Sequence, residues 1–444
     1  MSTAHRALSW LRKLWSTRLG VIFQSLFIGL LTGIVVLAFR VGLARGEQLR
    51  TDMYTALAIA SPLWTILWTL ALIGLGLLLG AMSLHHPMIK GSGIPQIKGE
   101  LIRKMSHSWM PELPMKLVSG LLAIGAGLSL GREGPSVQMG GYIGKAISRI
   151  GRRSQTELRY LLISGSAAGL SAAFNAPLAG VLFALEELNK HFSPLLLVCA
   201  MAASAAGDFV SSQFFGMQPT FSFPAITPLP LTHFHWLAVL GIMAAITGDL
   251  FKRGLYLSQD FYTATRLPPI LRPVIALLAS IPLGFFLIEA TGGGHELVEL
   301  LAVIRYPIAA IALLFFVKLA FTALSYGAGT AGGIFLPLLV CGALLGTGFG
   351  TALWHAGIVP EGEIINFLIL GMAAFFTAVV RAPVTGAVLI LEMSGNLSHL
   401  GGLVVVCLVA QIICDLIHSR PVYDVLLHRQ LVFKAAGPRI AQQE

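Results

Sequence analysis

The chain is built from long apolar runs that alternate with shorter apolar runs. The long runs lie near residues 20–45, 62–82, 193–216, 233–255, 270–290, 305–326 and 400–417. Each approaches the roughly 20 apolar residues that an α-helix needs to cross a bilayer. These runs predict membrane-spanning helices.

The shorter runs are interrupted by glycine and proline. They lie near residues 117–130, 132–148, 160–173, 178–188, 334–355, 364–379 and 384–394. They predict half-helices and re-entrant segments, which are tolerated only where protein or a water-filled cavity surrounds them. No Ser-rich linker, charged block or low-complexity tract divides the chain. We therefore expect a single transmembrane domain over residues 1–444.

Composition supports a membrane protein, because only 11% of the 444 residues are charged and 56% are hydrophobic. Ordinary soluble domains carry about 25% charged residues. The net charge of +10 comes from basic residues that cluster between apolar segments and at both ends. Lys and Arg accumulate on the cytoplasmic side of membrane proteins. We expect this charge to place both termini in the cytoplasm, and we expect no nucleic-acid partner.

Two local patterns add detail to this expectation. Leu8, Leu11 and Trp15 recur at helical spacing among basic residues, which predicts an amphipathic helix over residues 1–18 at the cytoplasmic interface. The four cysteines all lie in apolar stretches without ligand spacing. They are typical of buried small hydrophobes, and we expect no metal site and no cofactor.

An internal repeat organises the chain. Four glycine and proline positions recur 202 residues later: Gly131, Pro135, Gly140 and Gly144 match Gly333, Pro337, Gly342 and Gly346. The segment APLAGVLFALEE from Ala176 resembles APVTGAVLILEM from Ala382, at an offset of 206. Matched breaks in two halves point to a transporter whose site lies at the repeat interface. We expect a first repeat near 20–216, a second near 233–423 and a short cytoplasmic tail over 424–444, with their relative orientation left open at this stage.

Three short loops carry the chemistry. They read GSGIP, GREGP and GIFLP and comprise Gly91, Ser92, Gly93, Ile94 and Pro95; Gly131, Arg132, Glu133, Gly134 and Pro135; and Gly333, Ile334, Phe335, Leu336 and Pro337. A helix N-terminus carries free backbone N–H groups and about half a positive charge. Glycine lets a ligand approach that backbone, and proline in the first turn loses no needed donor. These loops predict an anion site without a full positive charge, which would bind too tightly for release.

At these loops the chain resembles the CLC family of chloride channels and transporters. GLSAAFNAPLAGVLFALEE over 169–187 and RPVY over 420–423 are also similar to family segments. The resemblance implies an all-α membrane fold of about 18 helices in two inverted repeats with broken helices. It also implies a homodimer with one pathway per subunit in a bacterial inner membrane. Because only a short stretch follows Tyr423, we expect none of the paired cytoplasmic nucleotide-binding (CBS) domains that some relatives have.

The resemblance also implies a role for individual residues. Ser92 and Tyr423 match the hydroxyl donors to a central chloride, and the backbone amides of Ile334 and Phe335 complete that site. Glu133 matches the gating glutamate, which competes with chloride when ionised and leaves when protonated. Glu187 matches the internal glutamate that passes protons in family antiporters. The implied function is proton-coupled chloride exchange, and the protein is not expected to be an enzyme.

Glu187 breaks the internal repeat. The residue that corresponds to Glu187 in the second repeat, 206 residues later, is Met393, whereas the residue that corresponds to Glu186 is again a glutamate, Glu392. An ionisable residue inside a membrane segment is costly and is functional by default. Family channels commonly lack a glutamate at this position, so Glu187 favours exchange over a passive channel. The channel stays as the alternative.

Simpler interpretations accompany several of these residues. Ser92 could cap a helix, and Tyr423 could belong to an interfacial aromatic belt. We expect Arg132 to form a structural ion pair, and Glu186, Glu392 and Arg381 to hold helices together. Gln96 and Lys98 stand where some close relatives have acidic residues, which leaves open how Lys98 is paired near Lys116.

A remote alternative is an intramembrane serine hydrolase that uses Ser92. Such enzymes resemble a GxSG pattern, but Lys90 occupies the position of the first glycine. His355 and His399 both flank apparent segment ends, which is unfavourable for a catalytic base.

Overall fold

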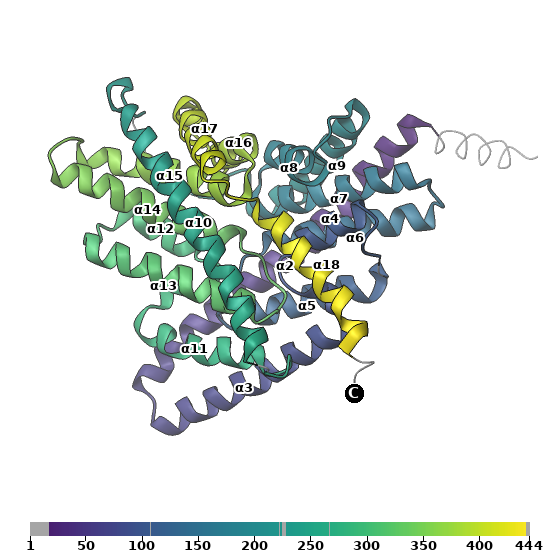
Figure 1. The fold of residues 1–444 in the computed structure, drawn as a ribbon, viewed down its shortest axis with the longest axis horizontal. Coiled ribbons are helices and arrows are strands. Elements are labelled where there is room, and N and C mark those ends of the chain that lie inside the picture. Colours follow the sequence, from purple (N-terminus) through teal and green to yellow (C-terminus); the bar gives the residue numbers. More distant parts are fainter. Residues whose placement is uncertain (1–16, 107, 222, 224–227, 266, 441–444) are drawn as a thin grey trace, which may run out of the picture.

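The computed structural model describes residues 17–106, 108–221, 223, 228–265 and 267–440, with side chains described as far as 432. Within this part the fold is helical, with 17 α-helices (Figure 1). They are α2 (Arg18–Ile59), α3 (Pro62–His85), α4 (Ile94–Leu101), α5 (Trp109–Gly125), α6 (Glu133–Ile150), α7 (Gln155–Phe174), α8 (Pro177–Phe183), α9 (Pro194–Phe215), α10 (His235–Ala264), α11 (Arg272–Phe286), α12 (His295–Val303), α13 (Ile308–Gly327), α14 (Phe335–His355), α15 (Ile364–Val380), α16 (Pro383–Ser394), α17 (Leu400–Leu416) and α18 (Val422–Ile440).

Short helical turns join several of these helices: η1 (Pro87–Ile89), η2 (Ala184–Asn189), η3 (Leu231–His233), η4 (Ile288–Ala290), η5 (Glu361–Glu363) and η6 (Leu397–His399). All are 3-10 turns except η2, which is a π-helical turn. The predicted interfacial helix over residues 1–18 lies almost wholly outside the described residues.

In the described part, eight helices are long and apolar enough to cross a membrane: α2, α3, α9, α10, α13, α14, α15 and α17. Six of them confirm long runs of the sequence. The run at 270–290 is different, because α11 is only 15 residues long and contains Pro282.

The runs at 334–355 and 364–379 were expected to be broken, and this expectation was wrong. They form the unbroken helices α14 and α15, and every residue of α15 is buried. The glycines of α14 permit close helix packing instead of breaking the helix. A Cβ at Gly346 would lie 1.9 Å from the carbonyl oxygen of Phe367.

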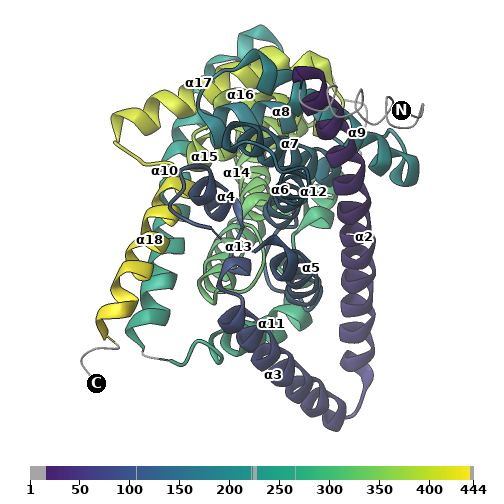
Figure 2. The same ribbon diagram turned by 90° about the vertical axis from the view of Figure 1, so that its right-hand side faces the viewer.

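The two halves meet through their backbones. Gly131 donates its N–H to the carbonyl oxygen of Gly333, and Gly333 donates to Gly131, both at 2.7 Å. This reciprocal antiparallel pair joins the residues matched by the repeat. Each residue of such a pair is related to the other by a local two-fold axis, as inverted halves require. Figure 2 shows α6 and α14, which begin just after this pair, between α2 and α18.

Buried lysines extend the repeat further than the sequence blocks. Lys116 on α5 donates to the carbonyl oxygens of Ile89 and Gly91, at 2.8 and 2.7 Å. Lys318 on α13, 202 residues later, donates to those of Ala290 and Gly292, at 3.1 and 2.9 Å. The loop before α12 is therefore the second-half counterpart of the GSGIP loop before α4. The boundaries of the two repeats stay a prediction.

Two glutamates, one in each half, each cap the start of a short helix in the opposite half. Glu186 accepts from the backbone N–H groups of Val384 and Thr385 at the start of α16. Glu392 accepts from Leu178 and Ala179 at the start of α8. A carboxylate at a helix N-terminus satisfies free N–H groups and the helix dipole. These contacts agree with the interpretation that both glutamates hold helices.

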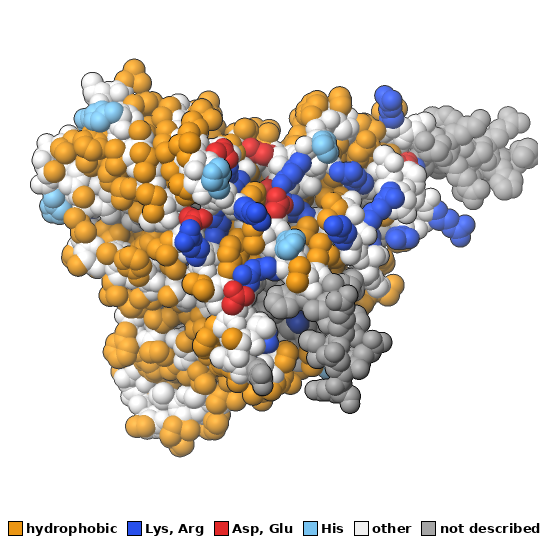
Figure 3. Space-filling model, viewed as in Figure 1, with side chains coloured by type: hydrophobic (Ala, Val, Ile, Leu, Met, Phe, Trp, Pro, Cys, Tyr) orange, Lys and Arg blue, Asp and Glu red, His pale blue; other side chains and the backbone are white. Residues whose placement is uncertain are grey.

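Other expectations concern buried sulfur and the surface. Cys199, Cys341, Cys407 and Cys414 are all buried and free. On the face that carries α18, charged side chains extend from the middle toward the right-hand edge, and hydrophobic ones cover the left and lower parts (Figure 3). This distribution suits a protein whose hydrophobic parts contact lipid and whose charged part faces water.

The close packing of α14 on α15 makes a testable prediction. Gly346→Ala should destabilise the protein by about 1–3 kcal/mol, because overpacking displaces the backbone of Phe367. The measurement is the midpoint of thermal unfolding in detergent. The control is Gly74→Ala on α3, where a Cβ meets nothing within 4 Å, and which should not lower the midpoint. Equal midpoints for the two variants would contradict the packing argument.

Candidate functional site

The three predicted loops meet at one place. The 91–95 loop contacts the strand-like segment before α14, where Gly91 donates to Thr330 at 2.8 Å and Gly332 donates to Gly91 at 3.1 Å. The pair between Gly131 and Gly333 adds the 131–135 loop. The openings of α4, α6 and α14 therefore converge, as the sequence predicts for an anion site.

Ser92 lies where α4 begins. Its Oγ accepts a hydrogen bond from the backbone N–H of Ile94 at 3.2 Å, and Gly93 takes the left-handed conformation, φ 91°, that makes this turn. Because Oγ acts here only as an acceptor, its proton stays available for another partner. The capping role and the ligand role of Ser92 are thus compatible.

The start of α6 approaches Ser92 closely. A Cβ at Gly134 would lie 2.7 Å from Oγ of Ser92 and 2.6 Å from its carbonyl oxygen. Only glycine permits this approach, which brings the N-terminal end of α6 to the first loop.

Tyr423 lies in the first turn of α18 and is fully buried. Its hydroxyl has no hydrogen-bond partner in the described part of the chain, although it lies close enough to Ser92 to interact with that side chain. A buried hydroxyl without an acceptor is rare in native structures. The position is unlike an interfacial belt, in which the phenol faces water.

Ile334 and Phe335 open α14 and are both fully buried. Their backbone N–H groups belong to the first turn, where no helical acceptor exists. The ring of Phe335 packs against Phe174 and Phe376, with ring centroids 5.3 and 4.9 Å away. This aromatic contact fixes the start of α14 relative to α7 and α15.

Glu133 is the first residue of α6 and is fully buried. Its carboxylate faces the backbone N–H groups of Leu336 and of Glu133 itself, at a geometry that completes no hydrogen bond. Nε of Arg132 lies 3.9 Å from Oε1 of Glu133, which is the ion pair expected for Arg132. A carboxylate held by helix openings occupies the kind of position that an anion would take.

Glu187 lies in the π-helical turn η2, and its side chain is buried. Lys190 and Gly395 end the two equivalent helices in the left-handed conformation and are 205 residues apart, whereas Glu186 and Glu392 are 206 apart. The first half therefore contains one additional residue, which a π turn accommodates. Such turns are frequent at functional sites.

A chain of charges surrounds Glu187. Nζ of Lys98 lies 2.5 Å from Oε1 of Glu187 and also donates to Asp424. Nζ of Lys190 lies 2.7 Å from Oδ2 of Asp424. The pairing of Lys98 is thus separate from that of Lys116, which donates to the carbonyl oxygens of Ile89 and Gly91. The partners Lys98 and Asp424 were not assigned from sequence, because they are 326 residues apart.

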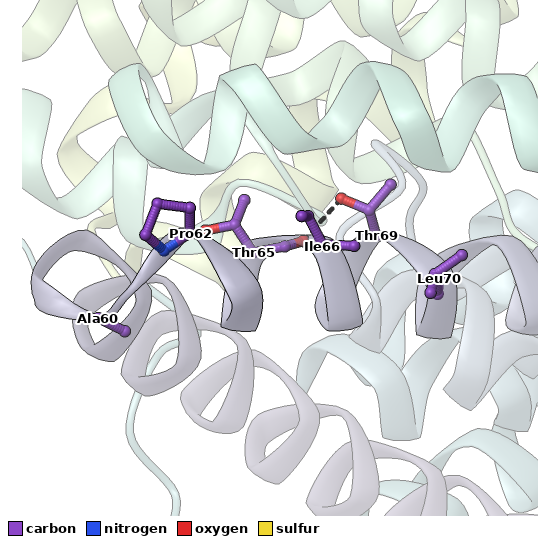
Figure 4. Close-up of a pocket in the computed structure, with 6 residues that line it drawn as sticks. All are labelled: Ala60, Pro62, Thr65, Ile66, Thr69 and Leu70. Carbon is purple, nitrogen blue, oxygen red and sulfur yellow. Dashed lines mark hydrogen bonds between the residues drawn. The ribbon is translucent and has the colours of Figure 1, made fainter.

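A groove also lies along α3, and its lining is unlike that of the loop site. It has a volume of about 450 Å³ and is lined by Ala60, Pro62, Thr65, Ile66, Thr69 and Leu70 (Figure 4). Its lining residues carry no charge, and the hydroxyl of Thr69 already donates to the carbonyl oxygen of Thr65. This groove therefore offers an anion no charged side chain.

Comparison with known proteins agrees with this geometry. The family model described as voltage gated chloride channel matches residues 75–415. The chain belongs to this family, the CLC family. It is therefore an integral membrane anion transporter and not an enzyme, as the sequence predicts.

Several CLC relatives resemble the chain over most of its length. The H(+)/Cl(-) exchange transporter ClcA of Salmonella schwarzengrund is 35% identical over 431 residues, which cover 94% of this chain and 89% of that protein. The structure of a slow cyanobacterial Cl-/H+ antiporter has a TM-score of 0.86 and 31% identity, and the match covers 94% of this chain and 98% of that one. A CLC-type fluoride/proton antiporter shares the fold, with a TM-score of 0.74 and 24% identity over 89% and 95% of the two chains.

The two hydroxyls of this CLC site generate a binding prediction. If Ser92 and Tyr423 bind chloride as the family resemblance implies, Tyr423→Phe and Ser92→Ala should each weaken chloride binding about tenfold, because each would remove a hydrogen bond to the ion. Isothermal titration of chloride into the detergent-solubilised protein measures this effect. Tyr262→Phe is the matched control, since Tyr262 is also fully buried with an unpartnered hydroxyl. Unchanged affinity in Tyr423→Phe would remove Tyr423 from the site.

Proposed function

We propose that this protein exchanges chloride for protons. The observation that carries the proposal is the arrangement of two buried carboxylates around one set of unpartnered donors. Tyr423 lies within electrostatic range of both Glu133 and Glu187, yet only Glu133 lies among the helix openings. One carboxylate competes with the anion, and the other lies off the anion route.

Glu133 couples the two ions by competition. When ionised, its carboxylate occupies the space before the N–H groups of α14 and excludes an anion. When protonated, it loses its attraction to these helix openings and to Arg132. A chloride ion then takes its place, so that one proton and one anion alternate at the same position.

Glu187 gives the proton a separate path. Ser92 and Tyr423 donate hydrogen bonds to the anion and offer no base for a proton. Glu187 supplies a base on η2, where Lys98 orients it. Its absence from the matched position, Met393, agrees with a task that only one half performs.

Chloride is the proposed substrate because the site combines neutral donors without a cation. The relatives named H(+)/Cl(-) exchange transporter and Cl-/H+ antiporter support this choice, since they are similar over nearly the whole chain. The fluoride/proton antiporter is similar in fold, so a fluoride assay belongs beside the chloride assay. A passive channel is the second candidate, and it lacks coupling between the two fluxes.

The remaining parts of the proposal concern assembly and placement. We propose a homodimer with one pathway per subunit in a bacterial inner membrane. The charged face of Figure 3 includes the start of α18 and would face the cytoplasm, following the positive-inside rule.

Replacing the gating carboxylate tests the competition. Glu133→Gln keeps the size of the side chain and removes its charge, so chloride should pass at a rate that no longer varies with pH and should carry no protons. Chloride efflux and pH change are recorded together from reconstituted vesicles. A variant that still pumps protons against their gradient would rule out Glu133 as the gate.

Replacing the internal carboxylate tests the separate path. Glu187→Ala should stop proton movement while chloride still passes, because the three loops are unchanged. Met393→Ala, at the matched position of the other half, is the control and should keep coupled transport. If Glu187→Ala still couples the ions, or if the parent protein's reversal potential follows chloride alone, exchange through Glu187 is wrong.

A further inference from the structure

A second cavity lies beside the gating residue, on the side of Arg132. Its volume is about 260 Å³, well above the roughly 10–15 Å³ that one water needs. Two of its lining residues are cationic, Arg40 and Arg132, and a third, His295, adds an imidazole ring. Burial and the two arginines lower the pKa of His295 to about 3, so its ring is neutral. The other lining residues are Ala44, Asn175, Phe215, Gln218, Pro219 and Thr220. No carboxylate is among the described residues that line it.

Both arginine side chains hold unused donors here, and the neutral ring of His295 adds a third in the tautomer that carries its proton on Nδ1. Nε of Arg40, Nε of Arg132 and Nδ1 of His295 are buried and have no hydrogen-bond partner in the described part of the chain. Arg40 is only 7% exposed. A buried charged group with an unsatisfied donor is costly unless something binds it. An anion in the cavity would accept from both arginines, and from His295 when the ring carries its proton on Nδ1.

The repeat shows which donors of Arg40 are surplus. Arg40 donates from Nη1 to the carbonyl oxygen of Ala172 near the end of α7, at 2.8 Å. Its second-half counterpart, Lys252, donates to the carbonyl oxygen of Ala378 near the end of α15, at 3.1 Å. The two acceptors are 206 residues apart, as the repeat requires. A lysine is therefore sufficient to hold the helix end. Nη1 of Arg40 also donates to Oδ1 of Asn175 and Oγ of Ser211, both at 2.6 Å, so the surplus donor of the guanidinium is Nε.

His295 is held by its neighbours in a way that leaves Nδ1 free. Its ring stacks on Phe221 at 4.9 Å, and Nε2 lies 3.7 Å from Oε1 of Glu299. It is the first residue of α12, whose opening repeats that of α4: Gly294 has φ 90°, and Gly93 has φ 91°. α4 opens onto the central site, and its second-half counterpart, α12, opens onto this cavity.

We propose that this cavity, which we call the outer cavity, binds a small inorganic anion with some of its water. It is an ion site distinct from the one at Ser92 and Tyr423, and it does not depend on proton coupling. The ionised carboxylate of Glu133 partly neutralises Arg132. Once Glu133 leaves, an anion in the outer cavity becomes the partner of the arginines and stands next to the vacated position.

The test uses bromide as the probe and the full-length protein. Crystals of the parent protein grown in bromide should show anomalous density in the outer cavity as well as at Ser92. The double variant Arg40→Lys with His295→Phe should lose the outer density and keep the inner one. Arg40→Lys preserves the donation that Lys252 makes in the other half, and His295→Phe preserves the ring stacking. His355→Phe, an exposed histidine stacked on Trp354, is the control.

Transport kinetics give a second measurement. For bromide supplied from the side of the outer cavity, the double variant should raise KM at least about tenfold, the effect of losing a hydrogen bond to an ion, with little change in kcat. The proposal is overturned if the parent crystals hold bromide only at Ser92, if the outer density persists in the double variant, or if KM is unchanged. Bromide density at Ser92 and the coupling of proton and chloride fluxes test the proposed exchange, and neither result depends on whether the outer cavity binds an anion.

Discussion

The reciprocal hydrogen bonds between Gly131 and Gly333 hold together the parts on which this site depends. Each residue stands directly before a helix opening, and the two N–H groups and two carbonyl oxygens satisfy one another. Backbone groups buried in a membrane protein need such partners, since lipid offers none. The pair thereby sets α6 and α14 end to end with their free N–H groups turned to the same space. Lys116 stabilises the opening of α4, because it donates to the carbonyl oxygens of Ile89 and Gly91 just before that helix.

A site built in this way attracts an anion with partial charges and keeps full charges at a distance. The proposed inner donors are Ser92, Tyr423 and the first amides of α14, all neutral. Lys98 is occupied by Glu187 and Asp424, and Arg132 lies 3.9 Å from Glu133. In the proposed mechanism such a site would hold an ion strongly enough for it to enter and weakly enough for it to leave.

Much of this arrangement could be predicted from the sequence, because loop motifs and repeat offsets are local or periodic signals. The loops 91–95, 131–135 and 333–337 were placed together correctly, and the carboxylate caps Glu186 and Glu392 were interpreted as structural. Gly346 shows where such reasoning fails: a glycine that permits contact with Phe367 looks the same in sequence as one that breaks a helix. Lys98 with Asp424 and Arg40 with His295 depend on tertiary contacts, for which the sequence carries no pairing signal. Lys318 is different, because it lies 202 residues after Lys116, the same offset as the glycine and proline matches. The sequence therefore contained the signal that these two lysines correspond, but the sequence analysis did not use it.

Two of the residues proposed to be functional, Arg40 and Glu187, stand where the two halves differ. Both halves hold the end of a helix with a cation, but one uses Lys252 and the other Arg40, which keeps a surplus donor beside the outer cavity. Both halves cap a short helix with a glutamate, but only the first adds a residue, the π turn and Glu187. A symmetric pair of repeats can create a central site open to an ion from either side. Coupled exchange requires more, because the proton and the anion must enter by different routes on at least one side of the membrane. Two identical halves would offer the same routes on both sides. A difference between the halves, such as Glu187, can therefore give one side a proton route that the other side lacks.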